Sequence, residues 1–311
     1  MFEHAVKNKI NLTRDDKKSD FYIAFGISKA FTYPVGVLIT SILENNKDMK
    51  ISFHIFVDDK IEDKELNRFK DLIEFYDTNI IIYEIDNSEF LNLDDREFTI
   101  ATYYRFAIPY QLKDLTDKYL YIDADMIAIR DLKDYLNINI ENKIAAVVDD
   151  FTLDKVGNPI LLAEDKKYFN AGMMYINLNL WMKEQVSEKS VSILREVNLD
   201  PKQKIKYGYE FRCFDQDALN IVLKNKVKYI EPKYNFLAES IVEFLKEHKD
   251  TKVLHVQGSF HGDEHLGVVE KVNKLNPSLK TVVITPIEAK DYEKMKHNYG
   301  EDTIIMTFVR K

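Results

Sequence analysis

Residues 21–85 alternate between short apolar runs and amphipathic segments, and this alternation restricts the fold more than any other feature. The runs Phe21–Ile27, Ile51–Val57 and Ile80–Ile85 are typical of buried strands. The segments between them, Pro34–Asn45 and Glu62–Tyr76, place apolar residues at helical spacings of three and four. Strands separated by crossover helices pair in parallel. We therefore expect an α/β fold with a parallel sheet at its start.

The predicted elements continue to about residue 256, and 311 residues with 45% hydrophobic content are enough to bury one large core. Residues 1–20 are polar and charged, and we interpret them as a loose leader before a single domain over residues 21–265. Residues 266–311 form a predicted C-terminal appendage. We expect helices over Ala101–Leu112, Leu180–Val197 and from Phe214 onward, and strands over Tyr119–Ile122, Ile144–Val148, Met173–Leu178, Val227–Ile230 and Lys252–Val256. Two short apolar runs, Thr281–Ile284 and Thr303–Val309, follow near the C-terminus.

Composition and charge exclude several classes of function. A formal net charge of −8 argues against nucleic acid as a partner, since such binding needs a basic face. Cys213 is the sole cysteine, which excludes internal disulfides and Cys-based zinc sites. No stretch approaches 18 consecutive apolar residues, and the N-terminus lacks an apolar signal segment. We expect a cytoplasmic protein. Peripheral contact with the inner face of the cell membrane is compatible with this, although no strong basic cluster supports it.

Two carboxylates follow the apolar run Tyr119–Ile122: Asp123 and, after one small residue, Asp125. Ionised groups at the end of a buried strand need a cation, a positive partner or water, because burying them unpaired is costly. Ligands bind at the carboxyl ends of strands in open α/β sheets, and one or two carboxylates commonly hold a divalent ion with substrate phosphates. The pair therefore favours a site for a metal and a diphosphate. Solvated acids at a strand end are the simpler alternative.

A phosphatase of the haloacid dehalogenase type is another interpretation of Asp123-x-Asp125, with the first Asp as nucleophile. Such enzymes normally carry Thr or Val two residues after the second Asp, where this chain has Ile127. Their motif also opens the domain, whereas two strand–helix units precede it here. We therefore regard this alternative as the weaker one.

Other candidate ligands lie at further strand and helix ends. Asp149 and Asp150 follow the run Ile144–Val148, and His255 precedes Gly258. A histidine added to two carboxylates would shift the preferred metal from Mg²⁺ toward Mn²⁺, and a glycine permits close backbone approach to a phosphate. A lone histidine on a strand is more often structural. Likewise, Asp215 is a plausible helix N-cap, and Arg105 among aromatic residues could form a structural ion pair.

Taken in order, several stretches between residues 21 and 260 resemble family 8 retaining glycosyltransferases, above all the bacterial enzymes that add hexoses to the lipopolysaccharide core. One such stretch would be weak, but this many in the family's order are specific. The matching residues are Ile23–Gly26 with Val35–Ile42, Tyr103–Phe106, Tyr121–Asp125, Tyr168–Gly172, Leu178 with Trp181, Asp215–Asp217, and His255 with Gly258.

The resemblance implies a Rossmann-like mixed sheet with flanking helices of the GT-A type, and transfer of glucose or galactose from a UDP-sugar with retention at the anomeric carbon. It implies that Asp123, Asp125 and His255 bind Mn²⁺ or Mg²⁺, and that Gln216, Asp215 and Asp149 lie near the reacting sugar. Gln216 is a poor nucleophile, so we favour front-face attack; double displacement would need Asp149, Asp215 or Asp217 to contact the sugar. The residues implied in donor binding are Ala24, Gly26, Ser28, Arg105, Asp123, Ala124, Asp125, Asn170, Ala171, Gly172, His255, Gly258 and His261.

The chain departs from the family pattern at two positions. Ser28 stands where the family often has an Asp that contacts the uracil, and His261 stands where it has a lysine that binds the diphosphate. A neutral imidazole supplies less charge than an ammonium group. The alternative is therefore a catalytically weakened relative that binds sugar nucleotides or glycans. The implied acceptor is a saccharide or glycolipid, such as lipopolysaccharide or another cell-surface glycan; the sequence does not fix the acceptor or the oligomeric state.

Overall fold

The computed structural model divides the chain into two compact units, Met1–Pro232 and Lys233–Lys311. The residues that the structure describes are 2–15, 18–93, 99–128, 130–150, 167–199, 211, 213–231, 283–288 and 303–308. The predicted domain boundary near residue 265, the predicted strand Lys252–Val256 and the positions of His255, Gly258 and His261 lie outside these ranges.

An eight-stranded mixed sheet forms the first unit, in the order β1-β4-β3-β2-β5-β7-β6-β8. Parallel pairing joins β2 to β3, β3 to β4, β2 to β5 and β6 to β8, whereas β1–β4, β5–β7 and β6–β7 are antiparallel. The predicted mixed α/β sheet is therefore confirmed. Its strands are β1 (Val6–Thr13), β2 (Phe21–Ile27), β3 (Ile51–Val57), β4 (Thr78–Ile85), β5 (Lys118–Ile122), β6 (Ala145–Asp149), β7 (Phe169–Asn177) and β8 (Val227–Tyr229).

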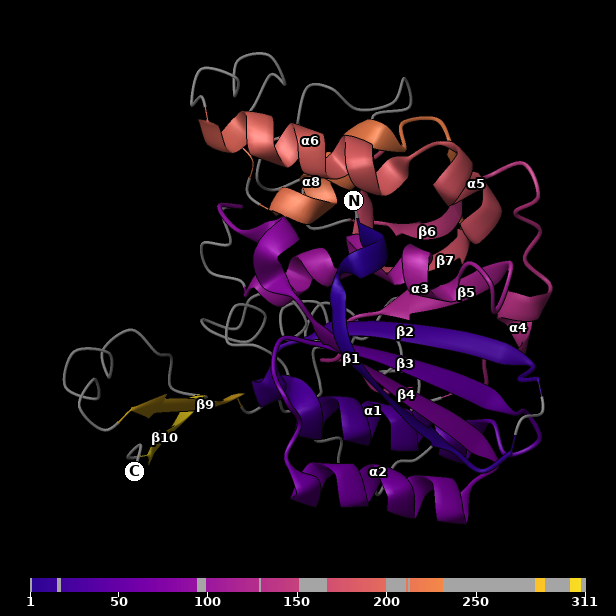
Figure 1. The fold of residues 1–311 in the computed structure, drawn as a ribbon, viewed down its shortest axis with the longest axis vertical. Helices are drawn as coiled ribbons and strands as arrows, with labels where there is room; N and C mark the ends of the chain where they lie inside the picture. The colour runs from indigo at the N-terminus through magenta and orange to yellow at the C-terminus, as the bar shows by residue number, and fades with distance from the viewer. Residues whose placement is uncertain are drawn as a thin grey trace. The chain divides into compact units, whose positions relative to one another are not determined.

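Helices flank this sheet on both sides (Figure 1). Helices α1 (Thr32–Asn45) and α2 (Asp63–Phe75) connect the parallel strands, and α2 buries Phe69 and Ile73, four residues apart, on one face. Helices α5 (Leu178–Lys183), α6 (Val186–Leu199) and α8 (Phe214–Val222) lie by β6 and β7. Shorter elements are η1 (Phe2–His4), η2 (Lys29–Phe31), η3 (Asn87–Phe90), η4 (Ile100–Phe106), α3 (Ile108–Leu112) and α4 (Lys133–Leu136). Within the described ranges, no helix is long and apolar enough to cross a membrane.

Four local predictions differ from the structure. The expected loose leader contains β1, because Ile10 and Leu12 alternate with polar residues and pair with β4 at the sheet edge. The helix predicted over residues 101–112 is a 3₁₀ helix followed by the short α3. The helix predicted over residues 180–197 is two helices, separated at Gln185, whose φ of 53° breaks the helical path. The strand predicted over residues 173–178 already begins at Phe169, so that residues 170–172 lie inside β7.

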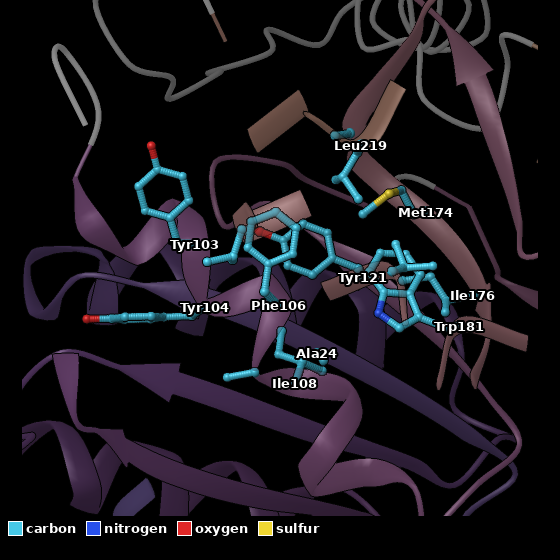
Figure 2. Packing of buried hydrophobic residues seen from close by; sticks show 14 of the residues in the cluster. Ala24, Tyr103, Tyr104, Phe106, Ile108, Tyr121, Met174, Ile176, Trp181 and Leu219 are labelled. Carbon is cyan, nitrogen blue, oxygen red and sulfur yellow. The ribbon is translucent and has the colours of Figure 1, made fainter. Parts of the chain in front are cut away.

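The core is rich in aromatic side chains from η4. Tyr103, Tyr104 and Phe106 are fully buried, as is Trp181 of α5 (Figure 2). The Trp181 indole N–H donates to the Ser187 hydroxyl at 2.9 Å, so burial leaves no polar atom of that ring unpaired. These aromatic residues belong to the buried core. They fix the position of η4, which carries Arg105.

The second unit contains two described strands, β9 (Val283–Glu288) and β10 (Thr303–Phe308), which pair in parallel. They overlap the two apolar runs predicted near the C-terminus.

A buried polar chain runs across β3 and β4. One ring nitrogen of His54 lies 3.0 Å from the Ser52 hydroxyl, and the other lies 2.9 Å from the Tyr83 hydroxyl. Burial, with a smaller contribution from Lys9, lowers the pKa of His54 to about 3. The folded protein therefore holds the neutral imidazole, and protonation at mildly acidic pH is favoured only in the unfolded chain.

This linkage predicts how stability changes with pH. Folding lowers the pKa of His54. Its contribution to the free energy of unfolding is therefore fully present above pH 6.5 and is lost as pH falls toward 3. Between pH 7 and pH 5, the free energy of unfolding should fall by about 2 kcal/mol more in the wild type than in His54→Phe. Urea denaturation at several pH values measures this difference. The exposed His4 offers a control, since His4→Gln should keep the wild-type slope. Equal slopes in wild type and His54→Phe would contradict the account.

Candidate active site

Asp123 lies directly after β5, at the carboxyl end of that strand in the middle of the sheet. Its backbone N–H donates to the carbonyl oxygen of Gly172 at 2.8 Å, which extends the contact between β5 and β7 by one residue. The Asp123 side chain is 36% exposed. Asp125 is also half-buried and follows in the turn after the strand. The predicted placement of both carboxylates at a strand end is confirmed.

A buried guanidinium holds the Asp123 carboxylate. Arg105, only 5% exposed, donates from Nη2 to the Asp123 Oδ1 at 3.0 Å and from Nε to the Thr102 carbonyl at 2.9 Å. Its Nη1 donates to the Ala171 carbonyl at 2.9 Å and lies 2.9 Å from the Asp215 Oδ2. A guanidinium has five N–H donors in a fixed plane, so these bonds orient it completely. Arg105 thus joins η4, β5, β7 and α8.

Glycine in β2 permits η4 to approach the sheet this closely. A Cβ on Gly26 would lie 2.9 Å from the Ala101 carbonyl oxygen and 3.2 Å from the Tyr104 Cβ. Real Cβ atoms do not approach a backbone oxygen that closely, so a side chain at this position would displace η4 and with it Arg105.

Charges around Arg105 shift the pKa values of its neighbours. Burial disfavours the charged guanidinium, yet the pKa of Arg105 is raised because the carboxylates of Asp215 and Asp123 outweigh that penalty. Burial raises the pKa of Asp215, and Arg105 offsets part of that shift. Burial also raises the pKa of Tyr121 well above its usual value, so its hydroxyl stays a donor and bonds the Asp123 Oδ1 at 2.8 Å. The Arg105 guanidinium also lies 4.4 Å from the Tyr121 ring centroid.

Gln216 on α8 has both ends of its amide engaged. Its Oε1 accepts the Ala171 backbone N–H at 2.8 Å, so Nε2 faces the other way and donates to the Asp150 carboxylate at 3.0 Å. One turn further along α8, the Asn220 side chain accepts from the Phe169 N–H at 2.8 Å and donates to its carbonyl oxygen at 3.0 Å. These bonds dock α8 on the first residues of β7 and fix the direction of the Gln216 side chain.

Asp215 is not the helix N-cap that the sequence suggested. The N-cap residue is Cys213, and Asp215 lies inside the first turn of α8, where it pairs with Arg105. Asp217 instead takes up a backbone hydrogen bond at the start of the helix, since its Oδ2 accepts the Cys213 N–H at 2.9 Å. Its Oδ1 accepts from the Tyr168 hydroxyl at 2.5 Å. The side chains of Asp215, Gln216 and Asp217 at the start of α8 therefore each have different partners.

The start of β7 is shaped around the Asp123 carboxylate. A Cβ on Gly172 would lie 2.7 Å from the Asp123 Oδ2 and 3.0 Å from the Asn170 Oδ1. The Asn170 Oδ1 itself accepts the Gly172 N–H at 3.0 Å. The Asp123 Oδ1 thus accepts from Arg105 and Tyr121, while Oδ2 lies so close to Gly172 that a side chain at position 172 would displace it.

Most of the predicted site residues in the first unit are brought together. Direct bonds join Arg105, Asp123, Ala171, Asp215 and Gln216, and the strand register places Asp149 opposite Phe169, next to Asn170. Ala24 is different, because its side chain is fully buried in the core. Ser28 precedes η2, where the next N–H, that of Lys29, donates to Asp58 at 2.7 Å. Ala124 is buried in the turn between the two aspartates.

Asp123 and Asp125 are the two predicted cation ligands that lie within the described ranges. Their oxygens are hard ligands of the kind that Mg²⁺ and Mn²⁺ accept. Among the residues that the structure describes, no three His, Cys, Asp or Glu side chains gather in a way that could hold a metal ion. The predicted third ligand, His255, lies outside these ranges.

Sequence reasoning missed several residues that build the site. Tyr121 and Tyr168 were assigned only to matching stretches, although their hydroxyls bond Asp123 and Asp217. Asp150, and not Asp149, accepts from Gln216. The sequence does contain a signal for Asn220: it stands four residues after Gln216 and therefore lies on the same face of the helix.

Comparisons with known proteins identify the family of this chain. The sequence model described as "Glycosyl transferase family 8" matches residues 22–262. The lipopolysaccharide 1,3-galactosyltransferase of Salmonella typhimurium is 35% identical over 236 residues, which is 72% of this chain and 66% of the relative. A lipopolysaccharide 1,2-glucosyltransferase of Escherichia coli is 29% identical over 80% of this chain and 74% of that protein. The chain thus spans about two thirds to three quarters of the length of these two relatives.

Solved structures show the same fold. A crystal structure of the galactosyltransferase LgtC in complex with donor and acceptor sugar analogues has a TM-score of 0.59 at 20% identity, covering 88% of this chain and 99% of LgtC. A structure of an active-site mutant of LgtC gives a TM-score of 0.62 at 21% identity, covering 84% of this chain and 97% of that one. The predicted resemblance is confirmed, and the phosphatase alternative has no support: the chain belongs to glycosyl transferase family 8.

Proposed function

We propose that this protein is a metal-dependent retaining hexosyltransferase that moves glucose or galactose from a UDP-sugar to a saccharide acceptor. One observation carries the proposal. Arg105 and Tyr121 fix one oxygen of Asp123 at the end of β5, and Gly172, which has no Cβ, lets the other oxygen lie close against β7. The relatives above are named for transfer of galactose or glucose in lipopolysaccharide, and this favours a cell-surface glycan as the acceptor. The cytoplasmic location stays a prediction.

Asp123 and Asp125 would hold the divalent cation, with His255 as the proposed third ligand. When bound, such a cation supplies Lewis-acid stabilisation of the departing diphosphate. Arg105 is a positioning residue in this account. Its guanidinium N–H bonds go to carbonyl and carboxylate groups of the protein, which supports orientation of Asp123 and Asp215 more than direct contact with the donor.

Gln216, Asn170 and Asp149 lie where the donor sugar is proposed to bind. The side-chain amide oxygen of Gln216, Oε1, accepts a backbone N–H from β7, so it is poorly placed to attack an anomeric carbon. Asp215 is buried against Arg105, and Asp217 accepts from Tyr168 and Cys213. Double displacement through either of these two carboxylates would first have to break those bonds. This supports front-face attack, in which the leaving phosphate accepts the proton of the acceptor hydroxyl and preorganised dipoles stabilise the developing charge.

The proposed function predicts which ligands stabilise the protein. UDP-glucose or UDP-galactose should raise the melting temperature with Mn²⁺ present and have little effect when the metal is removed by EDTA, because ligands that bind only the native state stabilise it by mass action. GDP-mannose serves as the mismatched donor. UDP release from the stabilising donor should follow under the same conditions. Metal-dependent donor binding without UDP release under any condition would favour the alternative of a binding relative, and no stabilisation by any UDP-sugar would contradict the proposal.

Gly172→Ala tests the close approach of the Asp123 carboxylate to β7. The new Cβ would lie 2.7 Å from the Asp123 Oδ2, so we expect the carboxylate to shift and donor turnover with Mn²⁺ to fall by roughly 10²-fold. Steady-state UDP release measures the effect, and circular dichroism checks the fold. Gly36→Ala on α1 is the matched control, because its Cβ would meet only the Phe69 Cε1 at 3.9 Å. A fully active Gly172→Ala protein would show that Asp123 does not carry the proposed role.

A further inference from the structure

A positively charged pocket, separate from the residues around Asp123, lies in the first unit along the edge strand β8. It has a volume of about 200 Å³, and its described lining contains three lysines, Lys143, Lys167 and Lys224, and no acidic residue. The whole chain has a formal net charge of −8, so this lining reverses the sign of charge locally. Cations grouped around a concave surface raise the local potential for anions.

Contacts with other lining residues hold two of these lysines at the pocket. The Lys143 ammonium donates to the Asn225 carbonyl at 3.1 Å, and the Lys167 ammonium lies 4.7 Å from the centroid of the Tyr229 ring. Asn225 and Tyr229 belong to the same lining. An ammonium group is a common phosphate ligand in proteins, where it acts as a point charge. An aromatic ring beside it offers an apolar surface to a sugar ring.

The size of the pocket suits one small polar group. A cavity of about 150 Å³ accommodates a benzene ring, so 200 Å³ is enough for a phosphate group or a single pyranose ring. The Asn220 amide in the wall is bonded to the Phe169 backbone on both its N–H and carbonyl sides. The wall is therefore preorganised, and lysines are the charged groups in the described lining.

The pocket adjoins the candidate active site. Phe169 lines the pocket and precedes Asn170, and Asn220 lines it one helical turn, about 5.4 Å of rise, after Gln216. The Asn220 side chain also donates to the backbone carbonyl oxygen of Gln216 at 2.9 Å. A saccharide with its reacting end near Gln216 would therefore have its next sugars within reach of the lysines.

We propose that this pocket binds an anionic group, a phosphate or a carboxylate, on a sugar of the acceptor. The inference rests on the proposed function, because an acceptor exists only if the protein transfers a sugar. The simpler explanation is that lysines on an edge strand discourage pairing with other chains, and it predicts no preference for anionic sugars.

Ligand-observed NMR on the full chain, without donor or metal, tests the pocket directly. Glucose 6-phosphate, glucuronate and glucose serve as probes. An anionic probe should bind with a Kd about tenfold lower than that of glucose, and Lys143→Gln combined with Lys224→Gln should remove this preference. The phosphate and carboxylate probes show which anion is preferred. Lys228→Gln is the matched control, because side chains alternate along a strand and Lys228 faces away from Val227 and Tyr229, which line the pocket.

Equal binding of the three probes, or an equal loss in Lys228→Gln, would overturn the inference. The outcome is separate from the test of catalysis. UDP release with Mn²⁺ but no anion preference would refute the pocket alone. Anion binding that depends on Lys143 and Lys224, in a protein that releases no UDP, would support the pocket as an anion site and refute the proposed transferase.

Discussion

The buried guanidinium of Arg105 is the interaction on which the candidate site depends. It contacts a carboxylate after β5, a carbonyl in β7 and a carboxylate in α8, and these segments are far apart in the sequence. Charge buried in this way is stable only when every partner is in place, because leaving one ion unpaired in the interior costs several kcal/mol. The position of Asp123 therefore follows from the packing of η4 as much as from β5.

Small residues make that arrangement possible. Gly26 lets η4 lie against β2, and Gly172 lets the Asp123 Oδ2 lie close to β7. Around them, hydroxyl and amide groups take up the remaining hydrogen bonds: Tyr121 bonds Asp123, Tyr168 bonds Asp217, and Gln216 joins Ala171 to Asp150. The result is a set of oriented polar groups at the carboxyl end of a central strand, where open α/β sheets bind ligands.

Local patterns were enough to predict much of this fold. Apolar runs gave β2 and β3 at their observed bounds, and the spacing of apolar residues gave α1 and α2 within about two residues. Local patterns failed where tertiary contacts decide the structure. β1 is held by pairing with β4 and has only two alternating apolar residues, and the bend at Gln185 depends on a backbone conformation that side-chain periodicity does not reveal.

In the candidate site, too, local patterns predicted some features, and tertiary contacts decided the others. The position of Asp123 and Asp125 at a strand end could be read from the sequence, because an apolar run stops there. That Arg105 pairs with both Asp123 and Asp215 could not, since no spacing relates residues 105, 123 and 215. Asp215 even had a sufficient local explanation as an N-cap, which the structure replaces with an ion pair. The roles of His255 and His261 stay predictions.

A double-mutant cycle on Arg105 and Asp215 tests the central claim most directly. Arg105→Met should lower the free energy of unfolding by about 3–5 kcal/mol, because it leaves the buried Asp215 carboxylate without its cation. Asp215→Asn should lower it by less, because Arg105 keeps its ion pair with Asp123. The double variant should be less destabilised than the sum by about 1–3 kcal/mol, as measured by urea denaturation. Single effects that add to within about 0.5 kcal/mol would contradict the claim that this ion pair joins η4 to α8.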